Sequence, residues 1–126
     1  MIRYSEQNIN HKDISNVIKT LKSDLITTGP EVPKFEKSLA KKVNSKYCVV
    51  FNSATSALHS ACLALGLKKN DWLWTSANSF VASANCGLYC GAKIDFIDIE
   101  LKTFNIDLQK LEIKLQKAKK KNYYQK

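Results

Sequence analysis

Apolar residues repeat at helical spacing along the first part of the chain. Between His11 and Leu25 they recur at positions i, i+3, i+4 and i+7, which predicts an amphipathic helix. A second helix is predicted to begin near Pro33, because proline suits the first turn of a helix. The loop between the two, residues 26–30, contains a glycine and a proline, which interrupt regular structure. The apolar positions are Ile14, Val17, Ile18, Leu21 and Leu25 in the first helix and Phe35, Leu39 and Val43 in the second.

The rest of the chain alternates short apolar runs with helical patterns. The predicted strands are residues 47–51, 71–75 and 93–98, and the predicted helices are residues 54–65, 80–89 and a last one marked by Leu108, Leu111 and Leu115. Strands that alternate with helices predict the α/β class, in which helices cover a parallel sheet. Three strands are fewer than the usual five or six, so we expect the sheet to have an unpaired edge.

The overall composition is that of a soluble domain, with 44% hydrophobic and 25% charged residues. No apolar run in the 126 residues approaches the ~20 residues that cross a bilayer. The first ten residues lack the apolar core of a signal peptide. We therefore expect a cytoplasmic protein without a membrane partner.

The net charge of +9 comes largely from the C-terminal end. Residues 117–126 hold five lysines and no acidic residue, so the other 116 residues carry a net charge of +4. This tail continues a helical pattern and is interpreted as a solvated basic helix end, with no nucleic-acid partner. The alternative is a small basic module that binds nucleic acid through the tail, with Tyr123 and Tyr124 stacking on bases. Deleting the tail would abolish salt-sensitive affinity in such a module and would leave a phosphate site elsewhere unchanged.

The four cysteines, Cys48, Cys62, Cys86 and Cys90, all lie in apolar runs. Cys86 and Cys90 are four residues apart and would share one helix face, but the chain has no CxxC motif. A free cysteine in an apolar context behaves as a small hydrophobic residue. We therefore expect buried thiols and no metal site.

Residues 52–56, Asn-Ser-Ala-Thr-Ser, form a predicted strand-to-helix junction. In open α/β sheets, ligands bind where strands end and helices begin. A helix N-terminus offers unpaired N–H groups and a partial positive charge, and small residues let an anion approach them. The hydroxyls of Ser53, Thr55 and Ser56 would add donors for a phosphate. The alternative is that Ser53 only caps the helix, which is worth ~1 kcal/mol. Neither GxxxxGK[ST] nor GxGxxG is present, so the predicted site takes a single phosphate group.

Four segments make the chain similar to a known family. They read ITTGPEVPKFEKSL, FNSATSALHSACLALGL, SFVASANCGLYCGAKIDFIDIE and FNIDLQKLE. In this order they resemble the DegT/StrS group of sugar-nucleotide aminotransferases, and the resemblance runs from Tyr4 to Leu115. It implies the N-terminal part of the large domain of a pyridoxal-phosphate enzyme of the aspartate-aminotransferase fold (fold type I), with a truncated sheet and flanking helices.

The resemblance also implies roles at the cofactor, pyridoxal 5′-phosphate. Thr55 and Ser56 match the pair that holds the cofactor phosphate, and Ala54 keeps the turn small. Phe80 matches the aromatic residue that lies over the pyridine ring, where offset stacking is worth about 0.5–1.5 kcal/mol.

Further roles concern the substrate. Tyr4 and the loop residues Thr27, Thr28 and Gly29 match segments that approach the sugar nucleotide. The implied reaction transfers an amino group from glutamate to a UDP-4-keto-6-deoxy-N-acetylhexosamine, a step of pseudaminic acid synthesis, in a homodimer.

Two catalytic groups of the family have no counterpart in the sequence. They are the lysine that forms a Schiff base with the cofactor and the carboxylate beside the pyridine nitrogen, which the resemblance places beyond the chain end. We therefore expect a single partial domain, with helices and a substrate loop at 1–45, the start of the cofactor domain at 46–116 and the basic tail at 117–126. Transaminase activity is not expected of the chain alone.

Two alternatives keep the fold. Related proteins that dehydrate sugars replace the lysine by histidine, at a position outside this sequence. The chain could also be a remnant without function.

Overall fold

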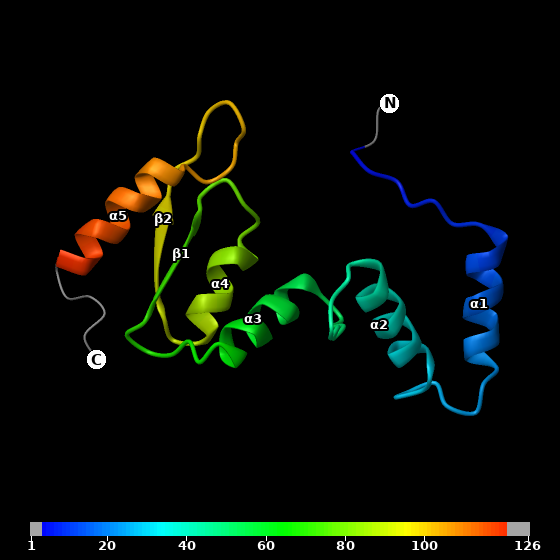
Figure 1. Cartoon of the computed structure of the whole chain (residues 1–126). Coiled ribbons are helices and arrows are strands. Elements are labelled where there is room, and N and C mark those ends of the chain that lie inside the picture. The colour runs from blue at the N-terminus through cyan, green and yellow to red at the C-terminus, as the bar shows by residue number, and fades with distance from the viewer. Residues whose placement is uncertain (1–3, 121–126) are drawn as a thin grey trace. The chain divides into compact units, whose positions relative to one another are not determined.

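The computed structural model describes residues 4–120, which form two compact units, one up to Val50 and one from Phe51 on (Figure 1). The description below takes each unit by itself. Within the described residues, no helix is both long and apolar enough to span a bilayer. Of the basic tail, residues 117–120 belong to the last helix, and the rest of the tail lies outside the described residues.

The first unit contains α1 (His11–Leu21) and α2 (Glu31–Lys42). Asn10 starts α1, because its side-chain oxygen accepts the backbone N–H of Lys12 at 2.8 Å. The carboxylate of Asp13 accepts the backbone N–H of Asn10 at 2.9 Å, which completes a capping box. The sequence predicted both helices, and the structure confirms them.

The end of α1 differs from the prediction. The apolar spacing predicted a helix to Leu25, but α1 ends at Leu21. The N–H and the hydroxyl of Ser23 both bond the carbonyl of Thr20, at 3.1 and 2.7 Å. A hydroxyl that bonds the backbone of the preceding turn competes with helical hydrogen bonding, so the last predicted turn does not form.

The segment 47–51 forms no strand, which corrects the sequence prediction. The backbone N–H of Val50 donates to the carboxylate of Glu36 at 2.9 Å instead of to a neighbouring strand. Along the segment, exposed side chains alternate with half-buried ones, as in a strand. A strand also needs a neighbouring strand that hydrogen-bonds its backbone groups. Within the described residues, no strand pairs with this segment.

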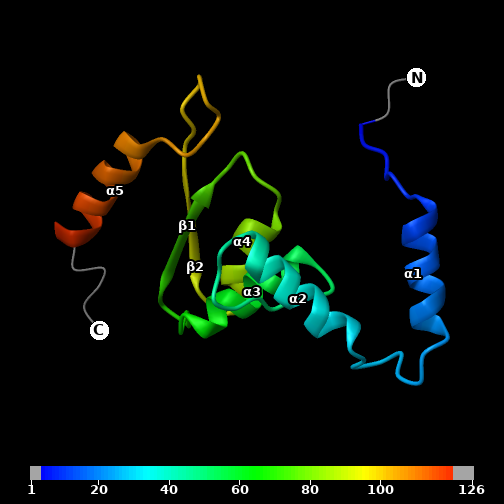
Figure 2. The ribbon, with the colours of Figure 1, turned by 45° about the vertical axis from the view of Figure 1, so that its right-hand side comes forward.

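The second unit is a two-stranded parallel sheet with helices on both faces. Its elements in order are α3 (Ala54–Ala64), β1 (Trp72–Ser76), α4 (Ala82–Tyr89), β2 (Lys93–Ile97) and α5 (Leu108–Lys120). The register runs from Trp72 opposite Lys93 to Ser76 opposite Ile97. Figure 2 shows α5 on the side of the strands away from α3 and α4. The predicted α/β class, with strands 71–75 and 93–98 and their helices, is confirmed within ±2 residues.

The sheet faces are set by the alternation of side chains along each strand. Leu73 and Ile94 face α4 and approach it closely at Gly87. A Cβ at Gly87 would lie 2.6 Å from Cδ1 of Ile94 and 3.1 Å from Cβ of Leu73. Trp74 points to the other face, where the Nζ of Lys114 from α5 lies 5.3 Å from its ring centre. In the described part of the chain, the buried apolar residues are Ala82, Cys86, Ala92, Ile97 and Ala118.

The outer edge of β2 is closed by the chain's own charged groups. The N–H of Phe96 donates to the carboxylate of Asp95 at 2.8 Å, and the carbonyl of Phe96 accepts from Lys114 Nζ at 2.8 Å. Lys114 also bonds the Asp95 carboxylate, which lowers the pKa of that group. Charged groups at an edge oppose the addition of another strand.

The outer edge of β1 is open. Because the N–H of Lys93 bonds the carbonyl of Asp71 at 2.8 Å, the alternation of a parallel ladder points the backbone groups of Trp74 and Ser76 away from β2. No described group hydrogen-bonds them there. A cavity of about 340 Å³ lies beside this edge, between residues 71–74 and the end of α3. The predicted unpaired edge is therefore confirmed.

Candidate functional site

The first turn of α3 leaves two backbone donors unpaired. Ser53 is the N-cap with extended backbone (φ −155°), and its hydroxyl oxygen accepts the N–H of Ser56 at 3.1 Å. The carbonyl of Ser53 accepts the N–H of Ala57 at 3.1 Å. Within the described residues, the N–H groups of Ala54 and Thr55 have no acceptor. Ser53 is therefore a helix cap, and two amides remain for a ligand.

The electrostatics of this turn favour an anion. The first turns of α3 and α4 contain no acidic residue, whereas α1 has Asp13 and α2 has Glu31 in that place. At α5, the carboxylate of Asp107 takes the N–H groups of the first turn. The partial positive charge at the start of α3 is thus not neutralised by a neighbouring carboxylate.

The side chains of the predicted phosphate pair remain accessible. Thr55 and Ser56 are half-buried, and Ala54 is exposed. The Ser56 hydroxyl lies 3.0 Å from the Ser53 hydroxyl, and no described group hydrogen-bonds the Thr55 hydroxyl. The turn therefore presents hydroxyl groups together with its free amides.

Phe80 lies at the same end of the sheet. It follows the C-terminal end of β1, and its carbonyl accepts the N–H of Ser83 at 2.9 Å as α4 begins. α3 and α4 pack against each other and both run opposite to the strands, so their N-termini share one end of the helix pair (Figure 1). Phe80 is 75% exposed, so it is no part of the core in the described chain. The exposure of Phe80 does not by itself indicate that it binds a ligand, because the neighbouring Val81 is also 60% exposed.

The predicted substrate residues lie in the first unit. Tyr4, Thr27 and Thr28 are exposed, and Thr28 has a positive φ of 51°. A Cβ at Gly29 would collide with the carbonyl oxygen of Leu25, so the loop itself requires glycine there. The role of these residues toward a sugar nucleotide stays a prediction.

In a parallel α/β sheet, free amides at a helix start beyond the strand ends are a position at which α/β proteins commonly bind anionic ligands. Residues 7–121 match the model of the DegT/DnrJ/EryC1/StrS aminotransferase family. The chain belongs to this family.

Individual relatives agree with the family. Over 117 residues the chain is 47% identical to a UDP-4-amino-4,6-dideoxy-N-acetyl-beta-L-altrosamine transaminase of Campylobacter jejuni, which covers 93% of this chain and 31% of that protein. Among solved structures, the PLP form of Spr1654 from Streptococcus pneumoniae, described as a sugar aminotransferase, is 32% identical with a TM-score of 0.85. That match covers 89% of this chain and 29% of that one. NtdA of Bacillus subtilis with bound PMP is 34% identical with a TM-score of 0.74, over 83% of this chain and 25% of NtdA.

The chain spans between a quarter and a third of the length of these relatives. The solved relatives include PLP and PMP forms, and pyridoxal 5′-phosphate is the cofactor of the family. When bound, this cofactor supplies the electron sink for amino transfer. The donors of the α3 turn fit its phosphate, because two free amides and the Thr55 hydroxyl lie together without a carboxylate among them.

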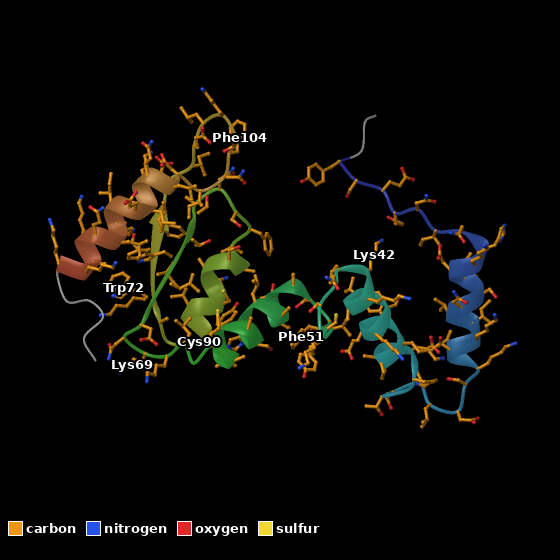
Figure 3. All side chains as sticks on the ribbon, in the orientation of Figure 1. Lys42, Phe51, Lys69, Trp72, Cys90 and Phe104 are labelled. Carbon is orange, nitrogen blue, oxygen red and sulfur yellow. The ribbon has the colours of Figure 1, made fainter. Side chains whose placement is uncertain are left out.

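Three thiols meet between α3 and α4, which the sequence did not predict. Burial raises the pKa of the Cys62 thiol to about 11, and hydrogen bonds with Cys86 and Cys90 add to this shift. Cys90, labelled in Figure 3, follows the end of α4. The thiols form no disulfide. Cys86 is buried as predicted, but Cys48, Cys62 and Cys90 are only half-buried, so the prediction of buried thiols is wrong for these three. Among the described residues, no group of three His, Cys, Asp or Glu side chains could hold a metal ion.

The Cys62 thiol is expected to resist alkylation. Only the thiolate reacts, and a rise in pKa from 9.0 to about 11 lowers its population at pH 8 by about 100-fold. Iodoacetamide should therefore modify Cys62 about 100-fold more slowly in the folded chain than in the chain unfolded in guanidinium, as peptide mass spectrometry would measure. Because the pKa of Cys62 is higher in the folded chain than in the unfolded chain, the free energy of unfolding depends on pH. The stabilising contribution of the neutral thiol is fully present below pH 9 and is lost as the pH rises through about 11. Equal rates in the folded and unfolded chains would contradict the raised pKa of Cys62.

Proposed function

We propose that this chain supplies the cofactor-phosphate and ring-stacking part of a PLP-dependent sugar-nucleotide aminotransferase. The observation that carries the proposal is the pair of free amides, of Ala54 and Thr55, at the first turn of α3. In this role the amides and the Thr55 and Ser56 hydroxyls bind the phosphate. Phe80 lies over the pyridine ring and fixes its plane. Each hydrogen bond to the charged phosphate is worth about 1.5–3 kcal/mol.

The proposed substrates are glutamate and a UDP-4-keto-6-deoxy-N-acetylhexosamine. The pairing of NSATSALH with SFVASAN and NID resembles transaminases of pseudaminic acid synthesis. The Campylobacter relative, named as a transaminase of a UDP-linked amino sugar, supports this choice. Tyr4 and residues 27–29 are proposed to approach the sugar nucleotide. We further propose that the active enzyme is a cytoplasmic homodimer, and that residues 1–126 form a single partial domain of it.

Replacing Thr55 by valine tests the phosphate site. Valine keeps the branched shape and removes the hydroxyl, so binding of pyridoxamine 5′-phosphate should weaken by about 10-fold or more. Pyridoxamine phosphate is the appropriate probe because it has no aldehyde to react with surface lysines. Nuclear magnetic resonance titration of the α3 amides measures the affinity.

The matched control is Ser60→Ala, which removes a hydroxyl from the same helix outside its first turn and should leave the affinity unchanged. Pyridoxamine without phosphate should not shift the amides of Ala54 and Thr55. The proposal would be wrong if pyridoxamine phosphate left these two amides unshifted, or if Thr55→Val bound it as tightly as the wild type.

A further inference from the structure

The three thiols of the second unit come together where α3 packs against α4. Cys62 lies in the last turn of α3, and its thiol hydrogen-bonds with the thiols of Cys86 and Cys90. The same two helix faces also hold the edge-to-face ring pair of His59, one turn before Cys62, and Tyr89, with ring centres 5.3 Å apart. The packing of the two helices therefore brings the thiols together.

Cys62 and Cys90 lie at the same end of this helix pair. Because α3 and α4 both run opposite to the strands, the last turn of α3 and the C-cap of α4, Cys90, share one end (Figure 1). Cys86 lies one turn deeper, is 2% exposed, and its Sγ donates to the carbonyl of Ser83 at 3.4 Å. Cys62 and Cys90 are half-buried, so they are the two thiols of the cluster that a small solute can reach.

A cavity beside Cys62 offers room for such a solute. It has a volume of about 340 Å³ and extends to residues 71–74 at the open edge of β1. Water occupies about 30 Å³ per molecule in the liquid, so a molecule as small as hydrogen peroxide fits in this space.

We propose that Cys62 and Cys90 form a reversible disulfide that joins α3 to α4, which makes this cluster a modification site for peroxides. A disulfide between Cys86 and Cys90 is disfavoured, because Cβ atoms four residues apart on a helix are about 5–6 Å apart and a disulfide needs about 3.8 Å. Cys62 lies about 12 Å along α3 from Ala54, at 1.5 Å per residue. The proposal is thus independent of the proposed function.

Two steps form the disulfide. The Cys90 sulfur attacks one oxygen of hydrogen peroxide, the O–O bond breaks, and the thiol proton leaves with the other oxygen as water, which gives a sulfenic acid. The Cys62 sulfur then attacks the Cys90 sulfur, the S–O bond breaks, and the leaving hydroxide takes the Cys62 proton as a second water. The two sulfurs are oxidised and the peroxide is reduced. Cys90 reacts first, because burial raises the pKa of the Cys62 thiol and keeps it protonated.

Peptide mapping of the purified chain after treatment with hydrogen peroxide tests the proposal. The reduced chain is oxidised, its remaining thiols are blocked with iodoacetamide, and it is digested without reductant. One linked peptide pair, Cys62 with Cys90, should dominate, and dithiothreitol should release it. The same treatment in guanidinium should give mixed pairings, because the unfolded chain no longer holds these two thiols together.

Two serine variants sharpen the test. Cys48 belongs to the first unit, so Cys48→Ser should form the linked pair as the wild type does. Cys62→Ser lacks the second thiol, so the sulfenic acid of Cys90 should proceed to sulfinic acid.

Hydrogen exchange gives a second readout. The slowest amides of α3 and α4 should exchange about 30-fold more slowly in the oxidised wild type than in the reduced chain, because the crosslink opposes unfolding. Peroxide-treated Cys62→Ser should show no such slowing.

A linked pair of Cys62 with Cys90 that dominates only in the folded chain supports the proposal. The proposal is wrong if the folded chain forms no linked pair, or the same mixture as the unfolded chain. A disulfide that joins two molecules, or one that contains Cys86 in place of Cys90, would also contradict it.

Discussion

The purified chain, mixed with pyridoxal phosphate, glutamate and a UDP-4-keto sugar, is expected to transfer no amino group. Transamination requires a lysine that attacks the cofactor, and such a lysine needs a desolvated, weakly basic amine. All lysines in the described chain are exposed except Lys114, which is half-buried. Its ammonium group is engaged by Asp95 and the carbonyl of Phe96.

The position of Lys114 also separates it from the proposed site. It lies over Trp74, on the face of the sheet opposite to α4, which packs on the Leu73 face. Among the other lysines, Lys110 hydrogen-bonds Asp98, which raises the pKa of its ammonium and makes it a poorer nucleophile. No lysine of the described second unit is thus suited to attack a cofactor at α3.

The measurement is the release of 2-oxoglutarate and of amino sugar, with the Campylobacter transaminase as positive control. Borohydride reduction followed by mass spectrometry adds a second test. Scattered low labelling of surface lysines is expected, because aldehydes react slowly with exposed amines. Turnover, or stoichiometric labelling of a single lysine, would contradict the prediction.

Replacing Gly87 by valine should open the contact between α4 and the sheet. A Cβ at this position would already lie 2.6 Å from Ile94 and 3.1 Å from Leu73, and valine adds two methyl groups beyond it. Overpacking of this kind costs about 1–3 kcal/mol. Hydrogen exchange of the α4 and β1 amides should therefore become about 5- to 150-fold faster.

The control for this variant is Leu88→Val, the next residue of the same helix. Leu88 is 55% exposed, so its replacement by the shorter, β-branched valine should change the hydrogen-exchange rates of α4 and β1 little. If Gly87→Val exchanged as slowly as the wild type, Ile94 and Leu73 would have room to move and the close packing of α4 would not be required.

The elements that the sequence predicted well are those whose signals are local. Asn10 and Asp13 fix the start of α1 within one turn, and the small residues after Asn52 mark the start of α3. The prediction of a strand at residues 47–51 was wrong, because a strand needs a partner strand and the apolar pattern of the segment does not encode one. The predicted end of α1 was wrong because the Ser23 hydroxyl bonds the carbonyl of Thr20, and this local hydrogen bond outweighs the apolar spacing.

The site shows the same division. A helix start with small hydroxyl residues was recognisable at Thr55 and Ser56, and the cap role of Ser53 was one of two open interpretations. The hydrogen bond between the two serine hydroxyls was not predicted, since it depends on rotamers. The cluster around Cys62 and the pair of Lys114 with Asp95 join residues far apart in the sequence, where spacing carries no information.

The two edges of the sheet differ, so further strands can be added on one side only. Asp95 and Lys114 hydrogen-bond the outer backbone groups of β2 at Phe96. A further strand therefore has to join beside β1, whether it comes from a longer chain or from another molecule. If it joins in parallel, its C-terminal tip comes next to Ser76, on the rim that also holds the start of α3. Each added strand would then widen the ligand-bearing rim and bring new side chains toward the phosphate turn.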